Sequence, residues 1–264
     1  MVEIGQHPAK LPFARMHGFD ANSYGDAFAD VYDDWYQGIS DVDLAVIELL
    51  DLAGGGPVLE LGVGTGRIAV PLAEAGLADG VAVVGIDASE AMLARLAWRD
   101  PGSLVTTIHG DMRYDLPDGP FALVFAAYNT LFNLTDEGAQ ARCFVDVHDR
   151  LRPGGRFVVE AFVPDDPPRR GDTVTVRSLA ADRVVLSVSI DDPANQSAEG
   201  QFVDLTQAEG VRLRPWSIRY STPEQLDEYA RAADLALELR WESFGRTPFD
   251  DESTRHVSVY RRRA

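Results

Sequence analysis

Residues 58–66 read VLELGVGTG, and this stretch decides the fold class. A short apolar run delivers Glu60, and three glycines follow at alternate positions, Gly62, Gly64 and Gly66. The residues after Gly66 carry apolar side chains at helical spacing. The stretch therefore predicts a strand, a tight turn and the start of a helix, an arrangement in which backbone can approach a nucleotide-like ligand closely.

The glycine spacing argues against a dinucleotide site. A G-x-G-x-x-G fingerprint beginning at Gly62 requires a third glycine at position 67, where the chain has Arg67. The only lysine of the chain is Lys10, so the Tyr-x-x-x-Lys pair of short-chain dehydrogenases is absent. A nicotinamide-dependent oxidoreductase is therefore disfavoured.

Composition limits the classes of partner. The chain has 264 residues, 45% of them hydrophobic, and a formal net charge of −18. Nucleic acid and anionic membrane surfaces both require positive charge, so neither is an expected partner. No apolar run approaches the ~20 residues that span a bilayer, and no signal-peptide pattern opens the chain, which predicts a cytoplasmic protein. A single cysteine, Cys143, excludes a cysteine-cluster metal site, and we expect no metal.

Beyond the glycine turn, strands and helices alternate regularly. We expect strands at 58–61, 81–86, 104–108, 123–126, 156–162, 236–243 and 256–261, and helices at 67–75, 89–98, 137–151 and 221–233. Near-continuous apolar strands between helices indicate a mostly parallel sheet that is covered on both faces. The predicted fold class is α/β: a doubly wound, Rossmann-like sheet of seven strands.

Two segments stand outside this alternation. Residues 24–36 place aromatic side chains near helical spacing, and residues 41–52 predict an amphipathic helix with Asp41 as its N-cap. After the proline-rich stretch 164–168, residues 172–220 alternate apolar and polar side chains in about four short runs separated by turn residues. This pattern predicts an antiparallel meander inserted into the α/β domain.

Two acidic residues follow predicted strands. Asp87 ends the second strand, about twenty residues beyond the glycine turn, where a carboxylate commonly accepts hydrogen bonds from ribose hydroxyls. Capping of the helix that begins at Ser89 is the alternative role for this acid. Asp111 stands just past the third strand. Further along, L-x-P-G-G at 151–155 predicts a sharp turn from a helix into the fifth strand.

In this order and at these spacings, the motifs resemble those of class I S-adenosylmethionine-dependent methyltransferases. The resemblance implies S-adenosylmethionine as the cofactor, with Asp111 near the adenine amino group and Met112 beside the ring. The segments AFADVYDDWY (residues 27–36) and WSIRYSTPEQLD (residues 216–227) resemble actinobacterial small-molecule members of that family, amino-sugar N-methyltransferases among them. In such relatives an N-terminal aromatic helix covers the cofactor as a lid.

The resemblance then assigns parts and residues. It implies a lid at 1–56, a cofactor-binding domain at 57–164 and 221–264, and an inserted sheet at 165–220. Its cofactor-binding residues would be Tyr24, Tyr32, Tyr36, Glu60, Gly62, Gly64, Gly66, Arg67, Asp87, Ala88, Met92, Asp111, Met112 and Tyr128. A packed aromatic stripe is the alternative reading of the lid tyrosines.

In this family the segment after the fourth strand, here residues 126–132, lines the space in front of the reactive methyl group. The resemblance therefore makes Tyr128 and Asn129 the candidate catalytic residues, which would position the acceptor. None of the five histidines falls in 128–132. A hydroxyl acceptor usually requires a base such as histidine, whereas an amine needs only to arrive neutral. We therefore expect methylation of a small molecule, on nitrogen before oxygen, by a monomer or homodimer. A cofactor-binding protein without turnover is the alternative.

Overall fold

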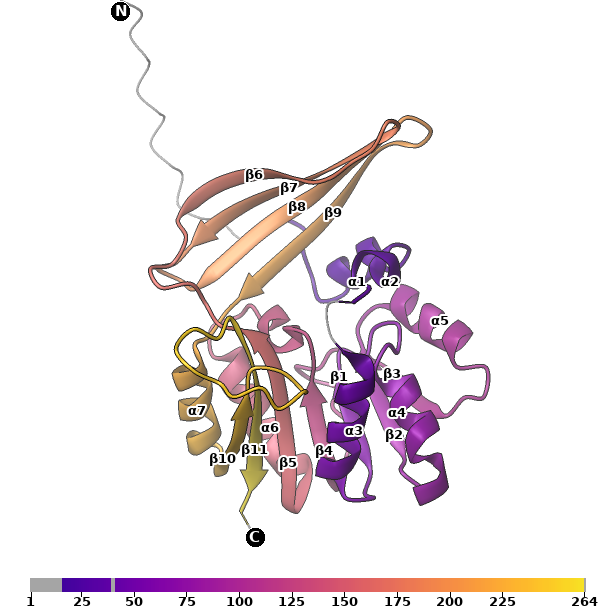
Figure 1. Ribbon diagram of the computed structural model, residues 1–264, viewed down its shortest axis with the longest axis vertical. Coiled ribbons are helices and arrows are strands. Elements are labelled where there is room, and N and C mark those ends of the chain that lie inside the picture. Colours follow the sequence, from indigo (N-terminus) through magenta and orange to yellow (C-terminus); the bar gives the residue numbers. More distant parts are fainter. Residues whose placement is uncertain (1–15, 39–40, 264) are drawn as a thin grey trace, which may run out of the picture.

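A seven-stranded sheet forms the centre of the computed structural model, which describes residues 16–38 and 41–263 (Figure 1). The strand order is β10-β11-β5-β4-β1-β2-β3. The strands are β1 (Val58–Leu61), β2 (Val83–Asp87), β3 (Val105–His109), β4 (Phe121–Ala126), β5 (Leu151–Phe162), β10 (Leu235–Trp241) and β11 (Arg255–Arg262). The pairs from β3 through to β5 are parallel, and β11 runs antiparallel to both β5 and β10. The mostly parallel sheet of seven strands is therefore confirmed.

Helices cover both faces of this sheet. They are α3 (Val42–Ala53), α4 (Ala69–Gly76), α5 (Glu90–Arg99), α6 (Ala139–Arg150) and α7 (Pro223–Ala232), with short 3-10 turns η1 (Leu77–Asp79) and η2 (Thr130–Asn133). Successive side chains of β5 point to opposite faces. Val158 joins the core that contains Leu49 of α3 and Leu72 of α4. Phe157 joins the core that contains Phe144 of α6.

Capping residues fix where three helices begin. The Asp41 side chain accepts a hydrogen bond from the Leu44 N–H at the start of α3. Ser89 does the same for the Met92 N–H at the start of α5. Thr222 caps α7 in a reciprocal capping box. These three helix starts agree with the sequence prediction.

The predicted turn at 151–155 lies inside β5 rather than before it. Phe121 pairs with Leu151 and Leu123 pairs with Arg156, so the intervening residues bulge out of the ladder. A Cβ atom on Gly155 would lie 2.9 Å from the Arg152 carbonyl oxygen, so only glycine fits there. The bulge continues the strand where the sequence predicted a separate connection.

The antiparallel meander forms a sheet of its own, here called the inserted sheet. Its strands, in spatial and chain order, are β6 (Gly171–Leu179), β7 (Arg183–Asp192), β8 (Ser197–Thr206) and β9 (Gly210–Arg219). It stands between β5 and α7 in the chain and projects beyond the carboxyl ends of the central strands (Figure 1).

Two short helices, α1 (Ser23–Phe28) and α2 (Tyr32–Trp35), lie between the inserted sheet and the central sheet and are here called the lid (Figure 1). The aromatic stretch 24–36 is not one helix. Arg214 of β9 donates a hydrogen bond to the Ala27 carbonyl oxygen, which would accept a backbone N–H if the helix continued. Helix α3, assigned to the lid from sequence, packs against the central sheet instead. Residues 1–15 and 39–40 of the predicted lid lie outside the described residues.

Candidate active site

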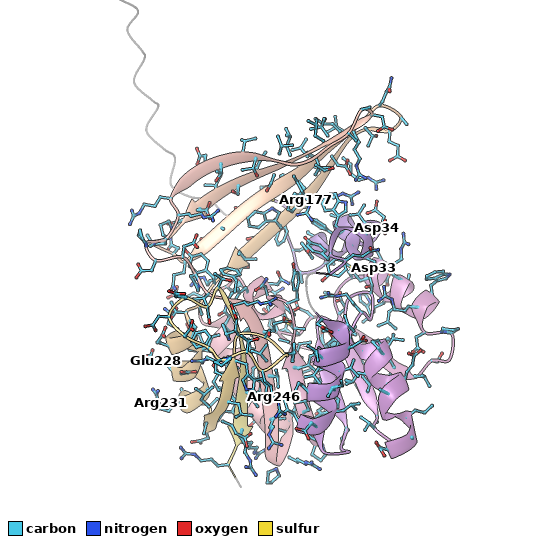
Figure 2. The ribbon with its side chains drawn as sticks, in the orientation of Figure 1. Asp33, Asp34, Arg177, Glu228, Arg231 and Arg246 are labelled. Atoms are coloured by element: carbon cyan, nitrogen blue, oxygen red, sulfur yellow. The ribbon has the colours of Figure 1, made fainter. Side chains whose placement is uncertain are left out.

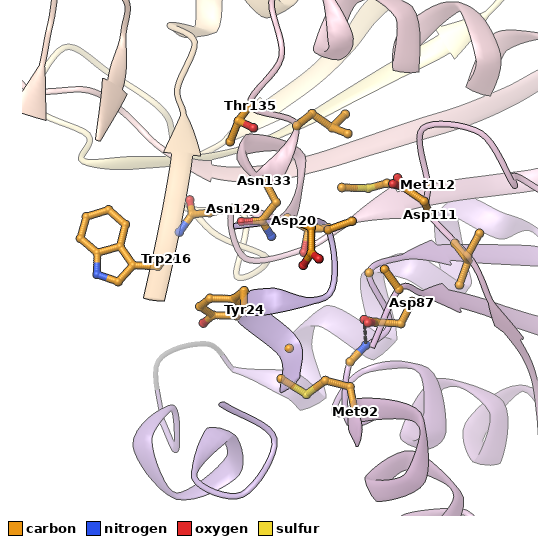
Figure 3. A pocket seen from close by; sticks show the side chains of 18 of the residues that line it. Asp20, Tyr24, Asp87, Met92, Asp111, Met112, Asn129, Asn133, Thr135 and Trp216 are labelled. Atoms are coloured by element: carbon orange, nitrogen blue, oxygen red, sulfur yellow. Dashed lines mark hydrogen bonds between the residues drawn. The ribbon is translucent and has the colours of Figure 1, made fainter. Parts of the chain in front are cut away.

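A pocket of about 300 Å³ opens where the central sheet, the lid and the inserted sheet meet. Of the residues predicted from sequence, its wall contains Tyr24, Tyr32, Tyr36, Gly62, Gly64, Asp87, Ala88, Met92, Asp111, Met112, Tyr128 and Asn129. Trp216 and Asn129 border one end, and Asp87 and Met112 border the other (Figure 3). The other predicted residues, Glu60, Gly66 and Arg67, do not line the pocket.

The glycine turn gives its three glycines different roles. All three have positive φ, between 54° and 74°. A Cβ atom on Gly66 would lie 2.8 Å from Leu96 and Val70, so this glycine serves the packing of the following helix. A Cβ atom on Gly64 would meet only the Gly62 carbonyl oxygen, at 3.9 Å. Gly64 therefore keeps open the space that a ligand would fill.

Asp87 is fixed at the end of β2 by backbone hydrogen bonds. Its Oδ2 accepts from the Gly64 N–H at 2.8 Å (Figure 3), and its Oδ1 accepts from the Ser89 N–H at 2.9 Å. Burial nevertheless raises the pKa of the carboxyl, against the lowering effect of both bonds. Each oxygen retains a lone pair for a hydroxyl donor. Both roles predicted for Asp87, ligand acid and support of the α5 start, are thus compatible in one geometry.

Asp111 lines the pocket but its carboxylate has a protein partner. Arg113 donates to it through Nε and Nη2, the latter at 2.6 Å, and contacts Asp136 at 2.8 Å with Nη1. The sequence did not predict this network, because an arginine two residues after an aspartate is also common in exposed loops where the two side chains do not pair. The network holds the Asp111 side chain in place at the wall.

Glu60 is buried beneath the turn. Burial raises its pKa well above the usual range, opposed by the charge of Arg67 and by the Ala69 N–H. The guanidinium of Arg67 also stands over the Tyr128 ring, 5.3 Å from its centroid. Glu60 therefore packs beneath the glycine turn, and Arg67 supports the ring of Tyr128.

Four phenol rings close the pocket on the lid side. The Tyr24 and Tyr36 hydroxyls are 3.2 Å apart. Tyr36 packs against Tyr32 at 4.9 Å and edge-on against Tyr128 at 5.7 Å between centroids. Burial raises the pKa of Tyr24 and Tyr32, and that of Tyr128 to about 12. The tyrosines thus form a packed stripe that also faces the pocket.

Three side-chain contacts tie the lid to the elements around the pocket. Ser89 donates to Asp26 at 2.6 Å. Thr65, inside the glycine turn, donates to Asp33 of α2 at 2.7 Å, and Arg99 of α5 pairs with the same carboxylate at 2.5 Å. None of these pairs has a sequence signal, since the partners come from loops and helices far apart in the chain.

The inserted sheet holds the lid from the opposite side. Arg214, almost fully buried, donates to Asp30 at 2.6 Å. Arg177 of β6 reaches down to the lid, where it donates to the Trp35 carbonyl oxygen at 3.2 Å (Figure 2). Phe202 and Trp216, from the same face of the inserted sheet, line the pocket. Trp216 opens the segment 216–227 that contributes to the family resemblance, whereas the sequence did not single out Phe202.

Tyr128 and Asn129 follow β4 in an unusual conformation. Both have positive φ, 50° and 63°. Glu160 of β5 holds them: its Oε2 accepts from the Tyr128 N–H and its carbonyl oxygen accepts from the Asn129 N–H, both at 2.9 Å. Asn129 Oδ1 in turn accepts from the Phe162 N–H at 2.8 Å. The Asn129 oxygen is therefore committed to the fold, and Glu160 is a supporting residue that the sequence did not reveal.

Comparison with known proteins agrees with this geometry. A family model described as a methyltransferase domain matches residues 58–155. The CcbJ methyltransferase from Streptomyces caelestis is 39% identical, with 93% of this chain and 100% of that chain covered and a TM-score of 0.85. The chain belongs to the S-adenosylmethionine-dependent methyltransferases.

Two further relatives of this methyltransferase are more distant. A cypemycin N-terminal methyltransferase from a Streptomyces species is 32% identical over 151 residues, which cover 56% of this chain and 60% of that protein. An amino pentose methyltransferase from Micromonospora echinaspora, solved with its cofactor bound, is 20% identical, with 97% and 100% of the two chains covered and a TM-score of 0.64. At that identity the likeness shows the shared fold.

The pocket of this methyltransferase fits its family's cofactor. Gly64 leaves the space of a side chain free, and Asp87 presents a carboxylate to the same space. Met92 and Met112 add apolar walls above and below that carboxylate (Figure 3). These residues would hold the nucleoside of S-adenosylmethionine.

Within 16–38 and 41–263, no group of three or more His, Cys, Asp or Glu side chains is placed to hold a metal ion. In the same ranges, no helix has the length and apolar character needed to cross a membrane.

Proposed function

We propose that this methyltransferase transfers the methyl group of S-adenosylmethionine to a nitrogen atom of a small-molecule acceptor. The observation that carries the proposal is the makeup of the pocket end opposite Asp87. That end is built from Tyr24, Tyr128, Asn129, Phe202 and Trp216. No histidine among the described residues lines the pocket.

This wall suits an acceptor that needs no strong base. Burial raises the pKa values of the wall tyrosines, so their phenols stay protonated near neutral pH. A neutral amine carries its own lone pair, whereas a hydroxyl has to lose its proton to become a good nucleophile. Aromatic rings also hold amines and exclude water. These properties favour nitrogen over oxygen as the acceptor atom.

The bound cofactor supplies a methyl group on a positively charged sulfur, which is already an activated leaving group. The protein has to align the acceptor with that methyl in a water-poor space. Alignment of this kind contributes up to about 7–11 kcal/mol to catalysis. Asp87 and Gly64 would fix the cofactor, the lid tyrosines would exclude water, and Glu160 would hold Tyr128 and Asn129 toward the acceptor.

The name of one relative supports a nitrogen acceptor. The cypemycin N-terminal methyltransferase, 32% identical over 151 residues, is named for an N-terminal amine. An amine on a small molecule and an amine at the end of a short peptide both suit a pocket of this size. The acceptor class to test first is therefore primary and secondary amines.

Calorimetry with S-adenosylhomocysteine tests the cofactor part of the proposal. We expect binding by the wild type, strong weakening in Asp87→Ala, and unchanged binding in Asp79→Ala, an exposed acid of η1 that serves as the matched control. NADH is expected not to bind. Equal loss in both variants, or no binding by the wild type, would contradict the assignment of the site.

Paired acceptors test the nitrogen part. Amino sugars and short peptides with a free N-terminus would be compared with analogues that carry a hydroxyl in place of the amine, by following release of S-adenosylhomocysteine. We expect turnover only with the amines, and a rate that rises with pH until the acceptor is neutral. Turnover restricted to the hydroxyl analogues would refute the proposal. Cofactor binding without turnover on any acceptor would favour a binding protein.

A further inference from the structure

Three acidic residues among those that the structure describes line the pocket, and they differ in how their carboxylates are engaged. Both oxygens of Asp87 accept backbone hydrogen bonds, and Asp111 is paired with Arg113. The third acid is Asp20, whose Oδ1 accepts hydrogen bonds from the Ser23 N–H at 3.1 Å and from the Ser23 hydroxyl. Its Oδ2 has no hydrogen-bond partner among the described residues. One carboxylate oxygen of the pocket wall is therefore free to accept from a ligand.

Asp20 lies between the two ends of the pocket. Figure 3 shows its side chain between Asn129, which borders one end, and Asp87, which borders the other. The residues on either side of it, Phe19 and Ala21, also line the pocket, so the whole turn that leads into α1 faces this space. The carboxylate thus stands where the nucleoside site at Asp87 gives way to the proposed acceptor end.

Hydrogen bonds with Ser23 hold this carboxylate in one orientation. The Asp20 N–H donates to the Ser23 hydroxyl at 2.9 Å, and that hydroxyl donates to Asp20 Oδ1. The segment before the turn is anchored as well, because the Met16 N–H donates to the buried Glu199 of β8 at 2.9 Å. A charge that is oriented before the substrate binds needs no rearrangement during the reaction, so it contributes more than a mobile one.

The pocket offers this carboxylate no counter-ion. Of the described residues that line the pocket, Arg113 alone is an arginine or lysine, and its guanidinium donates to Asp111 and Asp136. A positively charged N–H donor on a ligand is therefore the group that the free oxygen of Asp20 would bind most strongly.

We propose that Asp20 binds the acceptor nitrogen and stabilises the positive charge that develops on it; this rests on the proposed nitrogen acceptor. The nitrogen uses its lone pair to bond the methyl carbon, the electron pair of the carbon–sulfur bond stays on sulfur, and the positive charge moves to nitrogen. The nitrogen of a primary or secondary amine keeps its proton and donates it in a hydrogen bond to Asp20 Oδ2. That bond strengthens as the charge develops, so Asp20 favours the transition state over the bound amine.

Binding of cofactor analogues tests this role without any acceptor. Sinefungin resembles S-adenosylmethionine but carries an ammonium group on carbon in place of the methyl group on sulfur, so it presents N–H donors where the methyl group would be. In calorimetry we expect the wild type to prefer sinefungin over S-adenosylhomocysteine. Asp20→Asn, which keeps an oxygen for Ser23, should lose roughly 10- to 100-fold in affinity for sinefungin alone. Equal losses for the two ligands, or an unchanged affinity for sinefungin, would overturn the inference.

Asp34→Asn is the matched control for this experiment. Asp34 is an exposed acid of the lid that does not line the pocket, and its replacement changes the net charge by the same amount (Figure 2). It should bind both analogues as the wild type does. If Asp34→Asn weakens sinefungin binding as much as Asp20→Asn, the long-range field of the acids and not a contact would be responsible, and the inference would fail.

Steady-state kinetics with an amine that the wild type methylates separates this role from a structural one. We expect Asp20→Asn to lower kcat roughly 10- to 100-fold with little change in KM, because the bond to Asp20 strengthens only as charge reaches the nitrogen. An unchanged kcat would overturn the inference and leave the nitrogen acceptor standing. Turnover of hydroxyl analogues alone, in the wild type, would refute the nitrogen acceptor and this inference with it.

Discussion

Replacing Gly64 by alanine separates the fold from cofactor binding. Gly64 has φ +54°, and an alanine there costs about 1–2 kcal/mol because left-handed backbone is strained for a residue with a Cβ atom. For a chain of this size that cost lowers the melting temperature by about 2–8 °C. The new methyl group has no protein neighbour closer than 3.9 Å, so packing adds nothing to the loss of stability.

The same methyl group occupies space on the ligand side of the wall. Forcing a methyl group into a filled site costs about 1–3 kcal/mol, which corresponds to a roughly 5- to 150-fold weaker affinity. We therefore expect Gly64→Ala to bind S-adenosylhomocysteine that much more weakly in calorimetry, while remaining folded.

Gly80→Ala is the matched control for this experiment. Gly80 has φ +71° and no neighbour within 4 Å of an added Cβ atom, but it lies at the end of η1, away from the pocket. It should lose the same stability and bind the cofactor product normally. Equal affinity in the two variants would refute the role given to Gly64.

Three other perturbations have distinct expected results. Thr65→Val removes the hydrogen bond from the glycine turn to Asp33 of the lid and should speed release of S-adenosylhomocysteine roughly tenfold in stopped flow. An unchanged release rate would show that this contact does not control cofactor exchange. Arg214→Met should lower the free energy of unfolding in urea by about 2 kcal/mol. Arg212→Met removes an exposed ion pair to the same lid aspartate and should lower it by under about 1 kcal/mol. Equal losses in the two variants would show that burial of Arg214 adds nothing to its contribution. Burial lowers the pKa of His256 in the folded protein to about 3, whereas in the unfolded chain this histidine binds a proton below about pH 6.5. The folded protein therefore loses stability as the pH falls. Between pH 7 and pH 5 the free energy of unfolding of the wild type should fall by about 2 kcal/mol more than that of His256→Gln. Parallel plots of unfolding free energy against pH for the two proteins would contradict this role of His256.

Local chemistry made much of the fold predictable. Strand 58–61 could be predicted because its apolar run stops at glycines, and the starts of α3, α5 and α7 because Asp41, Ser89 and Thr222 are strong caps. The meander could be predicted from its alternating pattern. Each of these signals lies within a few residues of the feature that it specifies.

The rest depended on partners distant in the chain. The break between α1 and α2 follows from Arg214, almost two hundred residues later in the chain, which donates a hydrogen bond to the Ala27 carbonyl oxygen. The left-handed Tyr128 follows from a bond to Glu160. Sequence patterns carry no record of such pairs. The pocket-lining residues that follow β1, β2 and β3 were therefore predictable, and the contacts that hold the segment after β4 were not.

The links between the lid and the inserted sheet bear on how this enzyme could be redesigned. Segment 58–112 supplies the groups that would hold the cofactor, while segments 19–36 and 202–216 supply most of the remaining wall. Since the buried Arg214 of the second segment donates to Asp30 of the first, neither segment could be exchanged alone without breaking this pair. Transplanted together onto a related enzyme, they would form a single cassette for changing acceptor choice, with the methyl-donor half left untouched.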